Sequence, residues 1–200
     1  GRINSNEFTM LEFYRIEFNI HQLMDEIIEL LAALGSNATV KKLSYSQVFF
    51  EYSDIDILNS DINDLKTILN SLDLNSDDEW IEDIQMHLFV HLIEPKLKEI
   101  PLCFIYDFPK DQAALAEIHG PVAHRFEMYI NGTEIANGYQ EIQSAQEYRD
   151  RFNEELNKRK VLSKSFELLD HSFLKDLEEG LPYCSGVAIG IERLYSSLGL

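Results

Sequence analysis

The chain has 200 residues, of which 45% are hydrophobic and 26% are charged, and its formal net charge at pH 7 is −18. These values predict a single globular domain, residues 1–200, with a sizeable core. The negative charge argues against general nucleic-acid binding, because phosphate backbones are repelled. No apolar run approaches the ~18 residues that span a bilayer, and the cysteines, Cys103 and Cys184, are too few for a disulfide framework. We therefore expect a cytoplasmic protein with no membrane partner.

The first half of the chain predicts one strand followed by helices. Alternating apolar residues indicate a strand from Phe8 to Phe18. Asn19 is a suitable N-cap for a helix that ends near Leu34, before Gly35. Further helices are predicted at 44–50, at 61–72 and from Glu79 to about Leu92.

The second half is richer in strands. Strands are predicted at 102–108, ended by Pro109, at 122–130, after the turn Asn131-Gly132, and at 185–191. Ser144 and Glu147 form a capping box that opens a charged helix to about Lys160, and another helix is expected from about Phe166 to Glu179. Long antiparallel strands with helices inserted between them predict an α+β fold.

The predicted hairpin brings two carboxylates together. With Asn131-Gly132 as a two-residue turn, Tyr129 pairs with Glu134, and Glu127 pairs with Ala136. The two glutamates then share a face, roughly 7 Å apart. That separation suits two carboxylates that bind Mg²⁺. A solvated hairpin with exposed glutamates is the alternative interpretation.

Two further polar residues, Asn137 and Glu141, follow on the same strand. Strict alternation places both on the face opposite Glu134. If they share its pocket, the strand must bulge or twist, and Gly138 is the predicted place.

The last strand has one face with almost no side chains. Gly186, Ala188 and Gly190 share that face, and Arg193 follows the strand. Such a face allows a ligand to approach the backbone closely, although close packing of a helix is an alternative. The arginine is suited to binding phosphate, so the pattern favours a site that uses a nucleotide.

Three blocks of sequence resemble the catalytic core of the class II lysyl-tRNA synthetases. They resemble more closely the short paralogues of these enzymes, the ligases that join (R)-β-lysine to elongation factor P. Residues 6–15 (NEFTMLEFYR) resemble the second half of motif 2, residues 125–141 resemble the metal and substrate strands, and residues 184–194 resemble motif 3. The match runs in order along nearly the whole chain, and it implies an antiparallel sheet flanked by helices.

The resemblance also implies roles for individual residues. ATP and Mg²⁺ would be required. The residues implied for ATP are Phe8, which would stack on adenine, Asn4, Gly190 and Arg193. Glu127 and Glu134 would bind the Mg²⁺ that bridges the ATP phosphates, and with Arg193 they are the expected catalytic residues.

A second set of residues is implied for the amino-acid substrate. The residues expected around the distal ammonium of a lysine-like substrate are Glu12, Tyr14, Asn137 and Glu141. A diamino acid needs carboxylate and phenol oxygens at that end of its pocket. Ala188 stands where the synthetases have glycine, and in the ligase family this alanine favours β-lysine over α-lysine. One methyl group in a pocket wall shifts selectivity by ~1–3 kcal/mol.

The chain departs from the family pattern at several places. Asn4 replaces a histidine expected at the ATP phosphates, Glu192 replaces an aspartate, and residues 113–116 read AALA instead of ASLA. Motif 1, which forms the dimer interface, and the start of motif 2 with its ATP-binding arginine are not in the chain. We therefore expect a C-terminal portion, truncated at both ends, of a longer homodimeric ligase, and we expect this portion to be inactive alone.

Three functions are considered. The first is ATP-dependent activation of (R)-β-lysine and its transfer to a lysine of elongation factor P, without tRNA. The second is a lysyl-tRNA synthetase fragment, against which Ala188 argues. The third is a non-catalytic, synthetase-like module that binds a lysine-like ligand or a partner protein. ATP–pyrophosphate exchange distinguishes the module from the two enzymes.

Overall fold

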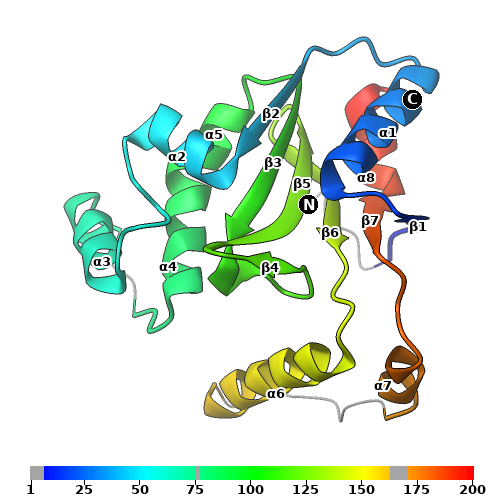
Figure 1. The fold of residues 1–200 in the computed structure, drawn as a ribbon. Helices are drawn as coiled ribbons and strands as arrows, with labels where there is room; N and C mark the ends of the chain where they lie inside the picture. Colours follow the sequence, from blue (N-terminus) through cyan, green and yellow to red (C-terminus); the bar gives the residue numbers. More distant parts are fainter. Residues whose placement is uncertain (1–6, 75–76, 163–170) are drawn as a thin grey trace.

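The computed structural model describes residues 7–74, 77–162 and 171–200 (Figure 1). The strands are β1 (Met10–Ile16), β2 (Val40–Ser44), β3 (Leu102–Pro109), β4 (Ile118–His119), β5 (Val122–Ile130), β6 (Thr133–Gln140) and β7 (Cys184–Gly190). The α-helices are α1 (Ile20–Ala33), α2 (Tyr45–Ser53), α3 (Ile62–Ser71), α4 (Ile81–Leu88), α5 (Glu94–Leu97), α6 (Ala145–Val161), α7 (His171–Glu178) and α8 (Ile191–Leu198). A π-helical turn, η1 (Phe89–Ile93), and a 3₁₀ turn, η2 (Lys110–Gln112), complete the elements of the described residues.

The strands form one sheet in the order β1-β7-β6-β5-β3-β2, and β4 pairs with β5. Neighbouring strands run antiparallel except β2 and β3, which are parallel. A mostly antiparallel sheet with helices inserted along the chain confirms the predicted α+β class.

Helices α1 and α8 cover one face of the sheet (Figure 1). Asn19 caps α1 as predicted, because its side chain accepts hydrogen bonds from the backbone N–H groups of His21 and Gln22. Arg15 joins β1 to this helix, since its Nε lies 2.8 Å from both carboxylate oxygens of Glu26. The core under this face includes Leu23, Ile27, Leu31, Phe104, Phe126, Met128, Val187 and Ile189.

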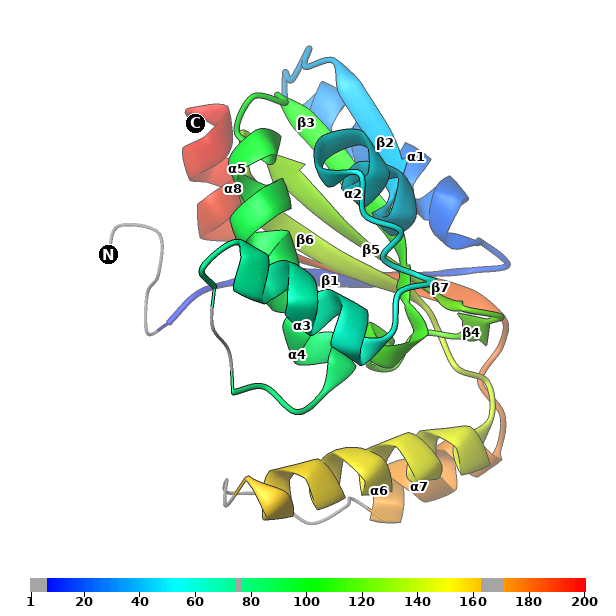
Figure 2. The same ribbon diagram turned by 90° about the vertical axis from the view of Figure 1, so that its left-hand side faces the viewer.

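Helices α2, α3 and α4 and the turn η1 build a second core on the opposite face (Figure 2). Cys103 and Ile105 of β3 point into this second core, whereas Phe104 between them points into the first. The contacts of these helices with the sheet are concentrated on β2 and β3. The same face of β6, β7 and β1 is left for the site described below.

A strand and a helix are among the elements that differ from the prediction. Strand β2 is not apparent in the sequence, because Lys41 and Lys42 hide its alternation. Lys41 pairs with Glu51 of α2 at 2.7 Å, and Lys42 pairs with Asp25 of α1 at 2.5 Å, so the two ammonium groups are held on opposite faces at the sheet edge. The helix expected to end near Leu92 continues through η1 to Leu97, because Pro95 lies in the first turn of α5, where its missing N–H is tolerated.

Helices α6 and α7 lie together in the connection between β6 and β7 (Figure 1). Ser144 accepts a hydrogen bond from the Glu147 N–H at 3.3 Å, which confirms the predicted cap of α6. Arg151 Nη1 joins this helix to the rest of the chain by donating to the Ala114 and Ala116 carbonyls at 3.1 and 2.5 Å. The expected start of the next helix, Phe166, lies outside the described residues. Among the described helices, none combines the length and apolar character needed to cross a membrane.

Candidate active site

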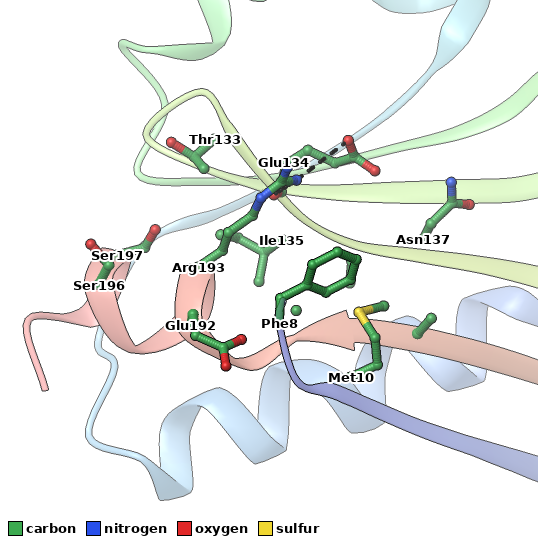
Figure 3. A pocket seen from close by; sticks show the side chains of 13 residues that line it. Phe8, Met10, Thr133, Glu134, Ile135, Asn137, Glu192, Arg193, Ser196 and Ser197 are labelled. Carbon is green, nitrogen blue, oxygen red and sulfur yellow. Dashed lines mark hydrogen bonds and ion pairs between the residues drawn. The ribbon is translucent and has the colours of Figure 1, made fainter. Parts of the chain in front are cut away.

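A cavity of about 710 Å³ lies between the start of β1, the first part of β6, the end of β7 and helix α8 (Figure 3). It is lined by Phe8, Met10, Thr133, Glu134, Ile135, Ala136, Asn137, Ala188, Gly190, Glu192, Arg193, Ser196 and Ser197. Six residues expected from the sequence are therefore brought together, namely Phe8, Glu134, Asn137, Ala188, Gly190 and Arg193. The volume is in the range of sites that bind a small molecule or cofactor.

Thr9 fastens the beginning of β1 to helix α8. Its N–H donates to both carboxylate oxygens of Glu192, at 3.0 and 2.9 Å, and its carbonyl accepts from the Ile191 N–H at 3.0 Å. The hydrogen bonds from the Thr9 backbone lower the pKa of Glu192, so this carboxylate stays ionised. Phe8 precedes Thr9 and is 64% exposed, with its ring in the cavity (Figure 3).

Arg193 extends from the first turn of α8 toward β6 (Figure 3). Its Nη1 donates to the Glu134 backbone carbonyl at 3.1 Å and lies 3.9 Å from the Glu134 carboxylate. A guanidinium beside an open cavity is suited to binding phosphate.

Gly190 leaves space in the cavity wall. A Cβ built on it would have Ile135 O, at 3.7 Å, as its nearest neighbour. Among the described residues, therefore, no atom requires a glycine here, and the space belongs to the cavity. Gly186 is different, because a Cβ there would lie 2.5 Å from Cε1 of Tyr14 and 3.0 Å from Oε1 of Glu141. On the small-residue face, a tyrosine ring packs at one end and the cavity opens at the other.

Glu127 and Glu134 share one face of the hairpin, as predicted, but the register between them is different. Asn131 and Gly132 both have positive φ, +48° and +75°, as a type I′ turn requires. Tyr129 pairs with Glu134 as expected. Glu127 pairs with Asn137, so the expected pairing with Ala136 is wrong.

The cause of this shift is a β-bulge at Ile135, three residues before the predicted position at Gly138. Met128 pairs with Ala136 and Tyr129 with Glu134, which leaves Ile135 as the extra residue. The predicted bulge at Gly138 is wrong, because Gly138 pairs regularly and is small for another reason. A Cβ on it would lie 2.3 Å from Cζ of buried Phe126.

The bulge places Asn137 on the face of Glu127 and directs it toward the cavity (Figure 3). Asn137 Nδ2 lies 3.5 Å from Glu127 Oε1, and within the described residues its Oδ1 has no hydrogen-bond partner. A buried amide oxygen without a partner is suited to accept a hydrogen bond from a ligand.

Glu127 is more enclosed than the sequence suggested. Its carboxylate forms an ion pair with Arg125 and accepts a hydrogen bond from the Tyr129 hydroxyl. Only 11% of its side chain is exposed, compared with 43% for Glu134. Sequence reasoning assigned no role to either partner, although Arg125 and Tyr129 lie two positions on either side of Glu127 and strand alternation puts them on its face.

Glu134 lies in a negative environment. Burial raises its pKa, and the nearby charge of Glu127 raises it further. Burial also raises the pKa of Glu94, again with a contribution from Glu127. Within residues 7–74, 77–162 and 171–200, no group of three or more His, Cys, Asp or Glu side chains has the geometry of a metal site. Two glutamates nevertheless suit a cation whose other ligands are phosphate and water, since Mg²⁺ is commonly bound in this way.

The residues expected around the substrate ammonium lie along the same face. Tyr14 is opposite Gly186 in the β1–β7 pairing, Glu12 is opposite Ala188, and the Glu141 carboxylate approaches the Tyr14 ring at Gly186. Burial raises the pKa of Glu141 to about 7. The pKa of Tyr14 is raised by burial and then by the charges of Glu141 and Glu12. An ammonium group placed among these oxygens would lower both pKa values and relieve this repulsion.

One expected residue, Asn4, lies outside the described residues. The cavity also contains hydroxyl groups that were not expected, those of Thr133, Ser196 and Ser197. The serines follow Arg193 by three and four positions on α8. Helical spacing therefore places them on the same side of the helix, and that periodicity is the signal by which they could have been found.

Two comparisons with known proteins identify the family of this chain. The family model of the class II tRNA synthetases (D, K and N) matches residues 2–199. An elongation factor P–(R)-β-lysine ligase from Proteus mirabilis (strain HI4320) is 42% identical over 200 residues, which cover 97% of this chain and 62% of that protein. The chain thus spans less than two thirds of the length of this relative. The resemblance read from the three sequence blocks is confirmed.

Proposed function

The chain belongs to the class II tRNA synthetases (D, K and N), and from this membership we propose that the protein uses ATP to activate a diamino acid, (R)-β-lysine, and transfers it to a lysine side chain of elongation factor P. The name of the P. mirabilis relative gives that substrate and that acceptor for the relative. The observation that carries the proposal here is the convergence of Tyr14 and Glu141 on Gly186, along the strand from the cavity that contains Arg193.

The cavity would hold the nucleotide. Phe8 presents an aromatic face for adenine, and Gly190 leaves room beside the backbone. Arg193 would bind a phosphate group and neutralise charge that builds up as the bond to pyrophosphate breaks. Glu134, with Glu127 behind it, would hold Mg²⁺, which when bound neutralises the ATP phosphates. The donor set fits, because the Glu127 charge contributes to the raised pKa of Glu134 and of Glu94, and a bound cation would relieve this repulsion.

The acidic end of the face would hold the distal ammonium of the substrate. Glu12, Tyr14 and Glu141 supply the oxygens, and Asn137 lies between them and the cavity. Ala188 pairs with both Glu12 and Asn137 in the sheet, so its methyl group lies where the substrate backbone must pass. We assign to this methyl group the preference for β-lysine over α-lysine.

The reaction would take two steps without a covalent enzyme intermediate. A carboxylate oxygen of the amino acid attacks the α-phosphorus of ATP and expels pyrophosphate, which forms an aminoacyl-adenylate. The ε-amine of the acceptor lysine then attacks the acyl carbon, loses a proton and expels AMP. The chain's own residues orient the two substrates and neutralise charge, and orientation alone supplies a large share of such rate enhancements.

The remaining parts of the proposal concern the protein in the cell. We propose that residues 1–200 belong to one catalytic domain, that the protein acts as a homodimer in the cytoplasm, and that tRNA is not its acceptor. The net charge of −18 supports the last point, since it opposes binding of an RNA backbone.

ATP–pyrophosphate exchange on the protein at its natural length tests the proposal, with (R)-β-lysine and α-lysine compared side by side. We expect exchange with both and a clear preference for (R)-β-lysine. A preference for α-lysine together with charging of tRNA would assign the protein to the lysyl-tRNA synthetases. Absence of exchange with either amino acid would leave a binding module that is not an enzyme.

A further inference from the structure

The Glu127 carboxylate has unusually few free positions for a residue expected to bind a cation. Its Oε1 accepts from Arg125 Nη2 and lies 3.5 Å from Asn137 Nδ2. Its Oε2 accepts from the Tyr129 hydroxyl. An ionised carboxylate offers about four lone-pair positions in total. In the part of the chain that the structure describes, three are directed at protein donors, which leaves one position on Oε2.

The Tyr129 hydroxyl is held in place by its surroundings. Tyr129 is 3% exposed, and its ring lies in the second core, 6.3 Å from the ring of Phe89. Its hydroxyl donates a hydrogen bond to Glu127 Oε2. The core therefore fixes the direction in which this donor points.

Arg125 is fixed from the opposite side. Its Nη1 donates to the Gln112 carbonyl at 3.0 Å, and its guanidinium lies 4.5 Å from the centre of the Phe108 ring. The Gln112 amide in turn donates to Tyr45 Oη at 3.2 Å and to Gln85 Oε1 at 3.0 Å. Tyr45 of α2 and Gln85 of α4 thus hold Gln112, and the Gln112 carbonyl in turn holds the Arg125 guanidinium beside Glu127 Oε1.

We propose that Tyr129 is a positioning residue, which together with Arg125 orients the Glu127 carboxylate so that it offers one lone pair to the nucleotide-bound cation, while the more exposed Glu134 is the adaptable ligand. This inference rests on the proposed function, since it takes the cation to be the one bound with ATP. Groups that orient metal ligands in this way typically change metal affinity about 10- to 100-fold when they are removed.

The experiment measures Mn²⁺ binding in the presence of ATP by electron paramagnetic resonance, with the protein at its natural length. The test variant is Tyr129→Phe, which removes only the hydroxyl. The matched control is Tyr52→Phe, which removes a hydroxyl 3.2 Å from Lys41 Nζ, outside the cavity. We expect Tyr129→Phe to weaken Mn²⁺ binding about tenfold, without changing the affinity for ATP measured in the absence of metal, and we expect Tyr52→Phe to have no effect on either.

A second variant, Arg125→Lys, keeps the test decisive if Tyr129→Phe does not fold. A single ammonium cannot span Gln112 O and Glu127 Oε1 as the guanidinium does, so Mn²⁺ binding should weaken here too. Unchanged or tighter Mn²⁺ binding in the folded variants would overturn the positioning role while leaving the proposed function intact. Failure of the unmodified protein to bind Mn²⁺ with ATP would overturn both.

Discussion

Gly138 and Gly186 lie on neighbouring strands. Alanine at Gly138 should lower the free energy of unfolding, whereas alanine at Gly186 should weaken substrate binding. A Cβ at Gly138 would lie 2.3 and 2.4 Å from two ring carbons of Phe126 and 2.9 Å from the Gly186 carbonyl oxygen. Phe126 is fully buried, and the carbonyl is part of the sheet, so neither can move away. Overpacking of this kind costs about 1–3 kcal/mol, and Gly138→Ala should lose that much free energy of unfolding.

At Gly186 the clash is with a movable group. The added Cβ would lie 2.5 Å from the ring of Tyr14, but Tyr14 is 62% exposed and can rotate into solvent. Alanine also reduces the entropy of the unfolded chain, which favours folding by ~0.4–1 kcal/mol. We expect the free energy of unfolding to stay within about 1 kcal/mol of that of the unmodified protein. Substrate binding should suffer instead, since a hydrogen bond to a charged group contributes ~1.5–3 kcal/mol, or at least about tenfold in KM.

Urea denaturation of both variants and the KM for the diamino acid in ATP–pyrophosphate exchange check this pair of predictions. We expect a loss of stability in Gly138→Ala and a loss of substrate affinity in Gly186→Ala. Equal destabilisation by both substitutions would show that Tyr14 is as rigid as Phe126. An unchanged KM in Gly186→Ala would show that Tyr14 does not contact the substrate.

Three further predictions concern the pH dependence, the hairpin and selectivity. Because burial raises the pKa of Glu141 to about 7, the carboxylate proposed to attract the substrate ammonium is lost as pH falls, so kcat/KM for the diamino acid should rise between pH 6 and pH 8; a flat profile would remove Glu141 from the proposed amine site. The native state also binds more protons than the unfolded state between the usual pKa and about 7, so stability from this group declines as pH rises through that window, and Glu141→Gln should stabilise the protein more at pH 8 than at pH 5 in urea denaturation. Gly132→Ala should lose about 1–3 kcal/mol in the same assay, since Gly132 has φ of +75° and a Cβ would lie 3.0 Å from the Lys98 backbone; a loss below ~0.5 kcal/mol would contradict this. Ala188→Gly should shift the preference toward α-lysine by roughly 5- to 150-fold, which corresponds to ~1–3 kcal/mol, and unchanged selectivity in the exchange assay would transfer the role to another residue.

Local signals in the sequence predicted most of the elements correctly. Asn19, Ser44 and Asp61 each accept backbone hydrogen bonds at the helix starts expected of them, and Asn131-Gly132 adopts the expected turn. These signals act over three or four residues, so the sequence contains all the information they need. β2 was missed because its two lysines are held by residues of α1 and α2, which no local pattern reveals.

The site was predictable as a set of residues and not as a geometry. The bulge lies at Ile135, whereas Gly138, the glycine that suggested a bulge, is small because the ring of Phe126 on another strand occupies the space beside it. The position of the Glu127 carboxylate depends on a chain of hydrogen bonds that runs through Arg125 and Gln112 to α2 and α4. Motifs and strand alternation indicate which side chains share a face. Packing between distant elements decides which of those side chains already have hydrogen-bond partners within the protein.

The hydrogen bonds between Thr9 and helix α8 also limit the conformational entropy that would be lost when a ligand binds in the cavity. Thr9 is held to α8 through both its N–H and its carbonyl. Phe8 precedes Thr9, Arg193 follows Glu192, and both Phe8 and Arg193 line the cavity. The backbone positions of Phe8, the proposed adenine platform, and of Arg193, the proposed phosphate-binding residue, are thus set relative to each other without a nucleotide. Among the described residues, the backbone of the proposed nucleotide site is therefore preorganised at Thr9 and α8, which lowers the entropy cost of binding there.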